Sequence, residues 1–105
     1  MNGRVPSGWV GILTCELHFS EAHSLKEKRH HLRSAKAQLQ NCIGASVAEV
    51  DHHDLWQRCA LTAAFVAREA GEAETLAAQA EAWLAAQEWV LVRADRVLLS
   101  SEDLS

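Results

Sequence analysis

The 105-residue sequence predicts one α+β domain whose segments follow the order strand, helix, strand, strand, helix, strand. Apolar residues alternate with polar ones in segments of strand length, as they do in a half-buried sheet. Two other segments repeat apolar residues every three to four positions, as amphipathic helices do. Hydrophobic residues make up 49% of the chain and charged residues 23%, a composition that supports a buried core and is atypical of a disordered chain.

The domain is expected to span residues 9–99, between a flexible leader over residues 1–8 and a tail over residues 100–105. No apolar run approaches the roughly 20 residues that span a bilayer, and the leader has no secretory signal. Three cysteines without a CxxC pair argue against a disulfide framework and favour a reducing compartment. We therefore expect a cytoplasmic protein that does not enter a membrane.

The first expected strand, residues 9–19, alternates between two faces. Its inward face carries Trp9, Leu13, Cys15 and Leu17, and its outward face carries Val10, Ile12, Thr14, Glu16 and His18. Ser24 and Glu27 then form a capping box, in which Ser24 accepts from the N–H of Glu27, and Glu27 accepts from the N–H of Ser24. The following helix has a stripe of Leu25, Leu32, Ala35, Leu39 and Ile43, and it is expected to end at Gly44.

The second half of the chain completes the pattern. Residues 45–51 and 56–67 are expected to form a hairpin, residues 71–87 the second helix and residues 89–99 the last strand. The alanine-rich composition also permits helix over residues 61–70, but Phe65 and Val66 favour strand. The last strand is less clearly patterned beyond Arg93. Right-handed crossovers then place both helices on one face of a four-stranded antiparallel sheet, a ferredoxin-like sandwich.

Four segments in order resemble the YlxP-like family of small bacterial proteins of unknown function. They are residues 9–13 (Trp-Val-Gly-Ile-Leu), 23–29 (His-Ser-Leu-Lys-Glu-Lys-Arg), 46–51 (Ser-Val-Ala-Glu-Val-Asp) and 55–58 (Leu-Trp-Gln-Arg). The resemblance covers residues 9–98 and implies a ferredoxin-like fold. It also implies a link to translation or ribosome maturation, because members are often encoded beside translation-initiation and ribosome-binding-factor genes. No catalytic residue comes with it. The longer leader and the alanine-rich second half depart from the family pattern.

The charges are unevenly distributed along a chain whose formal net charge is −4. Residues 22–43 hold five cations and one anion, a net +4, so the remainder carries −8. On a helical projection four of these cations share one flank: Lys26, Arg29, Arg33 and Lys36. Such a row is suited to tracking RNA phosphates. The resemblance implies that the partner would be ribosomal RNA or a ribosomal subunit. The alternative is a solvated flank whose long side-chain stems cover the core.

Lys28 falls nearer the apolar face of the same helix, where it either extends past the core to solvent or pairs with an acid of a neighbouring element. Trp56 and Trp89 are expected to be half-buried anchors, and Trp83 a core residue.

The sheet face away from the helices is the second candidate surface. It is too apolar to be left wholly in water, and it lacks the paired aromatic residues on which RRM-type sheets stack bases. A homodimer is the simplest way to cover it. The residues expected at this interface are Ile12, Thr14, Arg58, Ala60 and Thr62.

A third possibility is a metal or acid–base site formed by His18, His52, His53 and Asp54. Adjacent His52 and His53 point in different directions in a strand, and the i, i+4 spacing of a helical zinc site is absent. The sequence also lacks a phosphate-binding glycine loop and a nucleophile elbow. We therefore expect no catalytic residue, no metal and no cofactor, and predict a non-catalytic binding module with a homodimeric interaction module as the alternative.

Overall fold

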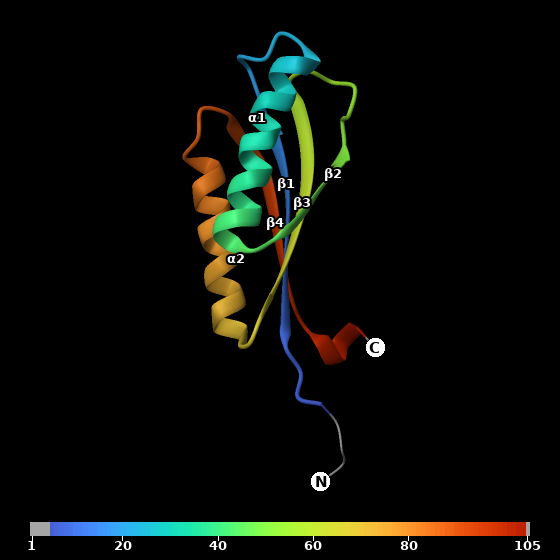
Figure 1. Ribbon diagram of the computed structural model, residues 1–105, viewed down its shortest axis with the longest axis vertical. Coiled ribbons are helices and arrows are strands. Elements are labelled where there is room, and N and C mark those ends of the chain that lie inside the picture. Colours follow the sequence, from blue (N-terminus) through green and yellow to red (C-terminus); the bar gives the residue numbers. More distant parts are fainter. Residues whose placement is uncertain (1–4, 105) are drawn as a thin grey trace.

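The computed structural model describes residues 5–104 and has the predicted βαββαβ order (Figure 1). The elements are β1 (Trp9–His18), α1 (Leu25–Gln38), a π-helical turn (Leu39–Ile43), β2 (Ser46–Asp51), β3 (Arg58–Ala67), α2 (Ala70–Ala85), β4 (Val90–Ser100) and a 3-10 turn (Ser101–Leu104). The strands form one antiparallel sheet in the order β2-β3-β1-β4. Both helices cover the same face of it, so the ferredoxin-like prediction is confirmed.

The core lies between the helices and the central strands. The side chains of β1 and β3 alternate as predicted, with Leu13, Leu17 and Leu61 almost fully buried on the helix side. The core-facing side of α2 consists mostly of alanine, and small side chains let a helix approach a sheet closely. Gly11 meets a similar constraint, because a Cβ atom at this position would collide with the ring of Phe65.

The start of α1 confirms one half of the predicted capping box and corrects the other. Ser24 Oγ accepts from the N–H of Glu27 at 3.1 Å. The Glu27 carboxylate, however, accepts from the N–H of His23 at 2.8 Å rather than from that of Ser24. Ser24 is extended, with φ −161° and ψ 163°, and the donor within reach of the carboxylate is one residue earlier. The helical segment ends at Gly44 as predicted, in the left-handed conformation with φ 76°.

The last strand has the predicted length but lies one residue later in the sequence, and it is less regular than an ideal strand. β4 continues to Ser100, and its register against β1 shifts between Glu16 and Leu17. Leu91 lies opposite Leu17 and Arg93 lies opposite Glu16, so Val92 is the extra residue of a β-bulge. The bulge explains why the alternation of apolar residues breaks in the middle of the strand.

The outer ends of β1 and β4 meet beyond the sheet. The N–H of Ser101 donates to the carbonyl of Gly8 at 2.9 Å, and the N–H of Gly8 donates to Ser101 Oγ at 3.1 Å. The expected leader and tail lie partly outside the described residues, which exclude residues 1–4 and 105. Neither helix in the described part of the chain has the length and apolarity needed to cross a membrane.

Candidate nucleic-acid interface

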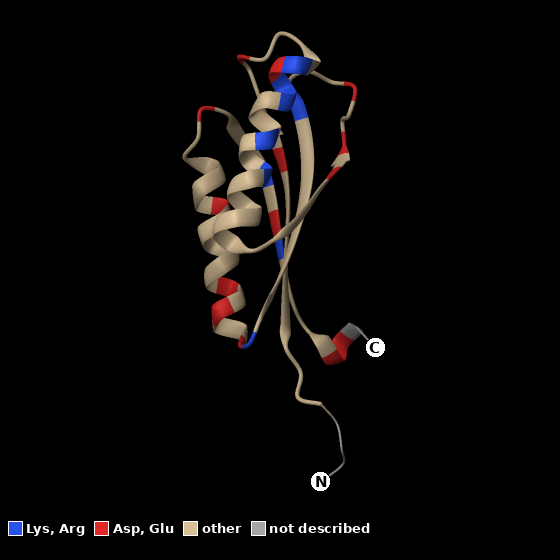
Figure 2. Cartoon of the chain, viewed as in Figure 1, with Lys and Arg blue, Asp and Glu red and all other residues tan. Residues whose placement is uncertain are grey.

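The predicted row of cations lies on the outward side of α1. Lys26, Arg29 and Arg33 are exposed, and Lys36 is half-buried. Lys36 follows Lys26 by ten positions, so the row extends about 15 Å along the helix axis, at roughly 1.5 Å per residue. Figure 2 shows basic residues along α1, whereas acidic residues mark α2 and the loop after β2. The structure therefore brings the four predicted residues together on one surface.

These four cations have no carboxylate partner within residues 5–104. The ion pairs of Lys and Arg in this part of the chain involve other residues: Lys28 with Glu49, Arg58 with Glu16, and Arg96 with Glu81. The acid nearest in sequence, Glu27, is held by the N–H of His23. The row on α1 thus keeps its charge available to an external anion.

The N-terminal half of the row borders a shallow hollow. Lys26 and Arg33 line it together with His30, Ser24, Glu27 and His31. The positive end of the helix dipole lies here and favours anions in the same way as the side chains do. The Glu27 carboxylate, which also lines the hollow, opposes an anion at this point.

Lys28 also lies on α1, but it does not belong to this row because its side chain is buried. Only 2% of its side chain is exposed, and Nζ lies 3.0 Å from a carboxylate oxygen of Glu49 on β2. The same ammonium donates to the carbonyl oxygen of His52 at 2.6 Å. His52 itself has a left-handed backbone with φ 63°. Of the two alternatives for Lys28, the structure has the pairing, which fixes the loop after β2 to α1.

The residues predicted for a dimer interface lie on the open face of the sheet. Thr14 and Thr62 are hydrogen-bonded at 3.2 Å in its centre, between partly buried Ile12 and Ala60. Arg58 donates to Glu16, and it is mainly this hydrogen bond that holds the pKa of the Glu16 carboxyl below its ordinary value. At the other end of the face the surface becomes apolar, with Val66 75% exposed and Val97 48% exposed.

His52 and His53 of the third hypothesis contact different carboxylates, whereas His18 and Asp54 line one hollow at the start of β3. His52 Nε2 lies 3.3 Å from Glu16 on the open face. His53 lies 4.0 Å from Glu49. Among the described residues, no group of three or more His, Cys, Asp or Glu side chains is arranged to hold a metal ion.

Two of the three cysteine thiols, Cys15 and Cys59, are buried and have raised pKa values. Burial raises the pKa of Cys15 to about 11 and that of Cys59 to about 12, where the nearby Glu49 carboxylate acts in the same direction. Cys42 is exposed at the end of the π-helical turn.

The tryptophans correct the sequence interpretation. Trp56 was expected to be half-buried, and it is 52% exposed, but it belongs to the loop before β3 rather than to the strand. Trp89 is buried at 7% exposure and packs edge to face with Phe19 and with the partly buried Trp83. The only signal in the sequence for the exposure of Trp56 was its position next to the polar run His52-His53-Asp54.

Comparison with known proteins identifies the family. The chain is similar over 49 residues, at 39% identity, to the uncharacterized protein YlxP of Bacillus subtilis. That alignment covers 47% of this chain and 53% of YlxP, so it spans about half the length of the relative. A family model described as a protein of unknown function, DUF503, matches residues 10–96. Because this match covers most of the chain, the protein belongs to the DUF503 family.

Proposed function

We propose that this protein is a non-catalytic cytoplasmic binding module that contacts RNA through the basic row of α1, and that the RNA is part of the ribosome or of a ribosomal precursor. The observation that supports this proposal is the row of four cations without carboxylate partners in the described chain. The choice of partner comes from the resemblance, since genes of YlxP-like proteins often lie beside genes for translation factors.

The proposal has a quantitative consequence. Each cation that neutralises a phosphate releases a counterion, and for single strands log K falls by about 0.7 per contact for each tenfold rise in salt. Four contacts then weaken binding by roughly 50-fold between 50 and 200 mM salt. A solvated helix flank that does not meet RNA has no such dependence.

The test is co-sedimentation of the untagged protein with ribosomal subunits through sucrose gradients at low and at moderate salt. We expect co-sedimentation that salt removes and that Arg29→Glu/Arg33→Glu abolishes. The single variants Arg33→Glu and Arg68→Glu form a matched pair, because each reverses the charge of one exposed arginine. Arg68 directly follows β3, outside the basic row, so Arg68→Glu is the control. Circular dichroism verifies that the variants are folded. The proposal is contradicted if Arg33→Glu and Arg68→Glu lose co-sedimentation equally, or if the parent protein does not co-sediment at either salt.

A second candidate function is a homodimeric interaction module that uses the open sheet face. The exposure of Val66 and Val97 favours it, because contiguous apolar surface on a sheet is commonly covered by a partner. Light scattering at micromolar concentration is expected to give the mass of a dimer. Ile12→Lys or Ala60→Lys is expected to give the mass of a monomer. A monomeric parent protein contradicts this candidate.

A further inference from the structure

Trp56 projects a large aromatic side chain from the loop over residues 52–57, between β2 and β3. About half of its surface is exposed, and the neighbouring Leu55 is 44% exposed. Exposed tryptophan is costly in water and is concentrated at sites where proteins bind partners or nucleic-acid bases. The function proposed above does not use this residue.

The loop holds Trp56 in a fixed position beside the start of α1. The side-chain amide of the next residue, Gln57, donates to the carbonyls of Ser20 at 3.3 Å and Ala22 at 3.1 Å. The N–H of Phe19 donates to the carbonyl of Gln57 at 2.8 Å. These partners belong to the connection between β1 and α1, just before the first turn that bears Lys26.

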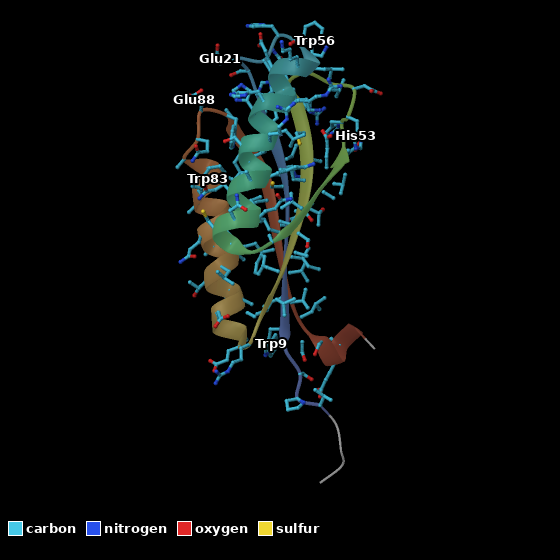
Figure 3. The ribbon with its side chains drawn as sticks, viewed as in Figure 1. Trp9, Glu21, His53, Trp56, Trp83 and Glu88 are labelled. Atoms are coloured by element: carbon cyan, nitrogen blue, oxygen red, sulfur yellow. The ribbon has the colours of Figure 1, made fainter. Side chains whose placement is uncertain are left out.

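The other end of the same loop is fixed to α1 by the buried Lys28 ammonium, which bonds the carbonyl of His52. Figure 3 shows Trp56 at the same end of the molecule as the start of α1. The indole and the basic row therefore belong to one continuous, hydrogen-bonded part of the molecule. The hollow beside the basic row and the hollow at Trp56 share no lining residue, so an RNA that contacts both has to pass around this end of the molecule.

The charges around Trp56 indicate which part of an RNA it would contact. The indole lines a shallow hollow together with His18, Asp54, Leu55, Gln57 and Arg58. The carboxylate of Asp54 opposes a phosphate there, and the charge of Arg58 is compensated by Glu16. The hollow is thus unsuited to the phosphate backbone. It suits a flat, uncharged group that presents a π-face, and nucleic-acid bases have one.

We propose that Trp56 stacks an unpaired base of the RNA whose phosphates lie along α1, so that the ligand is single-stranded RNA or an RNA loop rather than a duplex. This inference rests on the proposed function. Bases within an A-form helix are already stacked on each other, and proteins reach their faces only where the strand is open. The surface combines the two components of single-strand recognition, which are a cationic track and an aromatic platform.

Fluorescence anisotropy with a labelled single-stranded RNA of about 12 nucleotides, compared with a duplex of the same length, tests the inference. Loss of one stacked base weakens binding by about 5- to 150-fold, so we expect Trp56→Ala to lose affinity within this range for the single strand alone. Trp56→Phe is expected to retain most of the affinity, because it keeps an aromatic face. Val92→Ala is the matched control, since it shortens an exposed apolar side chain that cannot stack and does not line the hollow.

The salt dependence separates the role of Trp56 from that of the cations. Trp56→Ala removes no phosphate contact, so its slope of log K against log salt is expected to equal that of the parent protein. Arg29→Glu/Arg33→Glu is expected to reduce the slope. Thermal unfolding of Trp56→Ala verifies its fold, and if this variant does not fold, the comparison of Trp56→Phe with Trp56→Leu replaces it.

The outcomes distinguish failure of the inference from failure of the proposed function. If the parent protein binds RNA and Trp56→Ala binds it equally well, or if duplex and single strand bind alike, stacking is refuted while the cationic interface stands. If the parent protein binds neither RNA at low salt, the proposed function is refuted and the inference with it.

Discussion

Replacing Lys28 by Met is expected to destabilise the fold by about 3 kcal/mol. The substitution leaves the Glu49 carboxylate, which is 17% exposed, without its cation, and it removes the donor from the His52 carbonyl. Loss of one partner of a fully buried ion pair costs roughly 3–5 kcal/mol. Residual solvent contact of Glu49 favours the lower end of this range. Met has a similar length and flexibility, so the change leaves little cavity.

Urea unfolding followed by tryptophan fluorescence measures this loss. With an m-value of about 1.5 kcal/mol/M for a domain of this size, the midpoint should fall by about 2 M. The melting temperature should fall by about 12–24 °C, since 1 kcal/mol corresponds to about 4–8 °C. The pair Lys28→Met/Glu49→Leu is expected to recover much of the stability, because apolar residues of similar volume often replace buried ion pairs without loss.

Two results would refute this reasoning. If Lys28→Met unfolds within about 0.5 kcal/mol of the parent protein, it behaves as an ordinary surface substitution, and the ammonium does not hold the loop. If the double variant loses as much stability as both single variants together, the two side chains are not energetically coupled.

Three further predictions concern other parts of the domain. Gly11→Ala should destabilise the fold by about 1–3 kcal/mol, because its methyl group overlaps the ring of Phe65, and combination with Phe65→Leu should restore part of the loss in urea unfolding. In the native protein a thiol reagent at pH 8 should modify Cys42 alone, because burial raises the pKa of Cys15 and Cys59. After unfolding it should modify all three thiols, and fast modification of three thiols in the native protein would contradict this prediction. Arg58 lowers the folded-state pKa of Glu16, so this carboxylate contributes stability above the unfolded-state pKa, about 4.3, and the contribution is lost as pH falls through the lowered value. Glu16→Gln should therefore be less stable than the parent protein at neutral pH and equal to it in strong acid, as midpoints of unfolding at a series of pH values would show, and a constant difference would refute the assignment.

The order and the faces of the elements could be predicted because they depend on local periodicity. The alternation around Leu13 and Leu17 fixes which side of β1 is buried, and the residues that cap α1 are only three positions apart in sequence. The limits of β4 were predicted to within one residue, but its register against β1 could not be, because the bulge at Val92 shifts the register and hides the period of two.

The candidate surface was predicted in part for the same reason. The positions of Lys26 and Arg33 follow from the helical repeat alone. The partner of Lys28 does not, because Glu49 is 21 residues away and only the packing of β2 beside α1 brings the two together. The exposure of Trp56 depends on the course of a loop held by the distant Ser20 and Ala22 carbonyls, and no periodicity describes such a course.

The bonds between Gly8 and Ser101 have a consequence for how the domain can be joined to other chains. Both residues adjoin the pair Trp9 and Ser100, and Trp9 lies at the end of the sheet remote from Trp56 and from the start of α1 (Figures 1 and 3). A short linker between them, with new ends opened at Gly44, would give a circular permutant that keeps the same surface. Attachment to a support or to a fusion partner through either end leaves the basic row and the indole directed towards the solution.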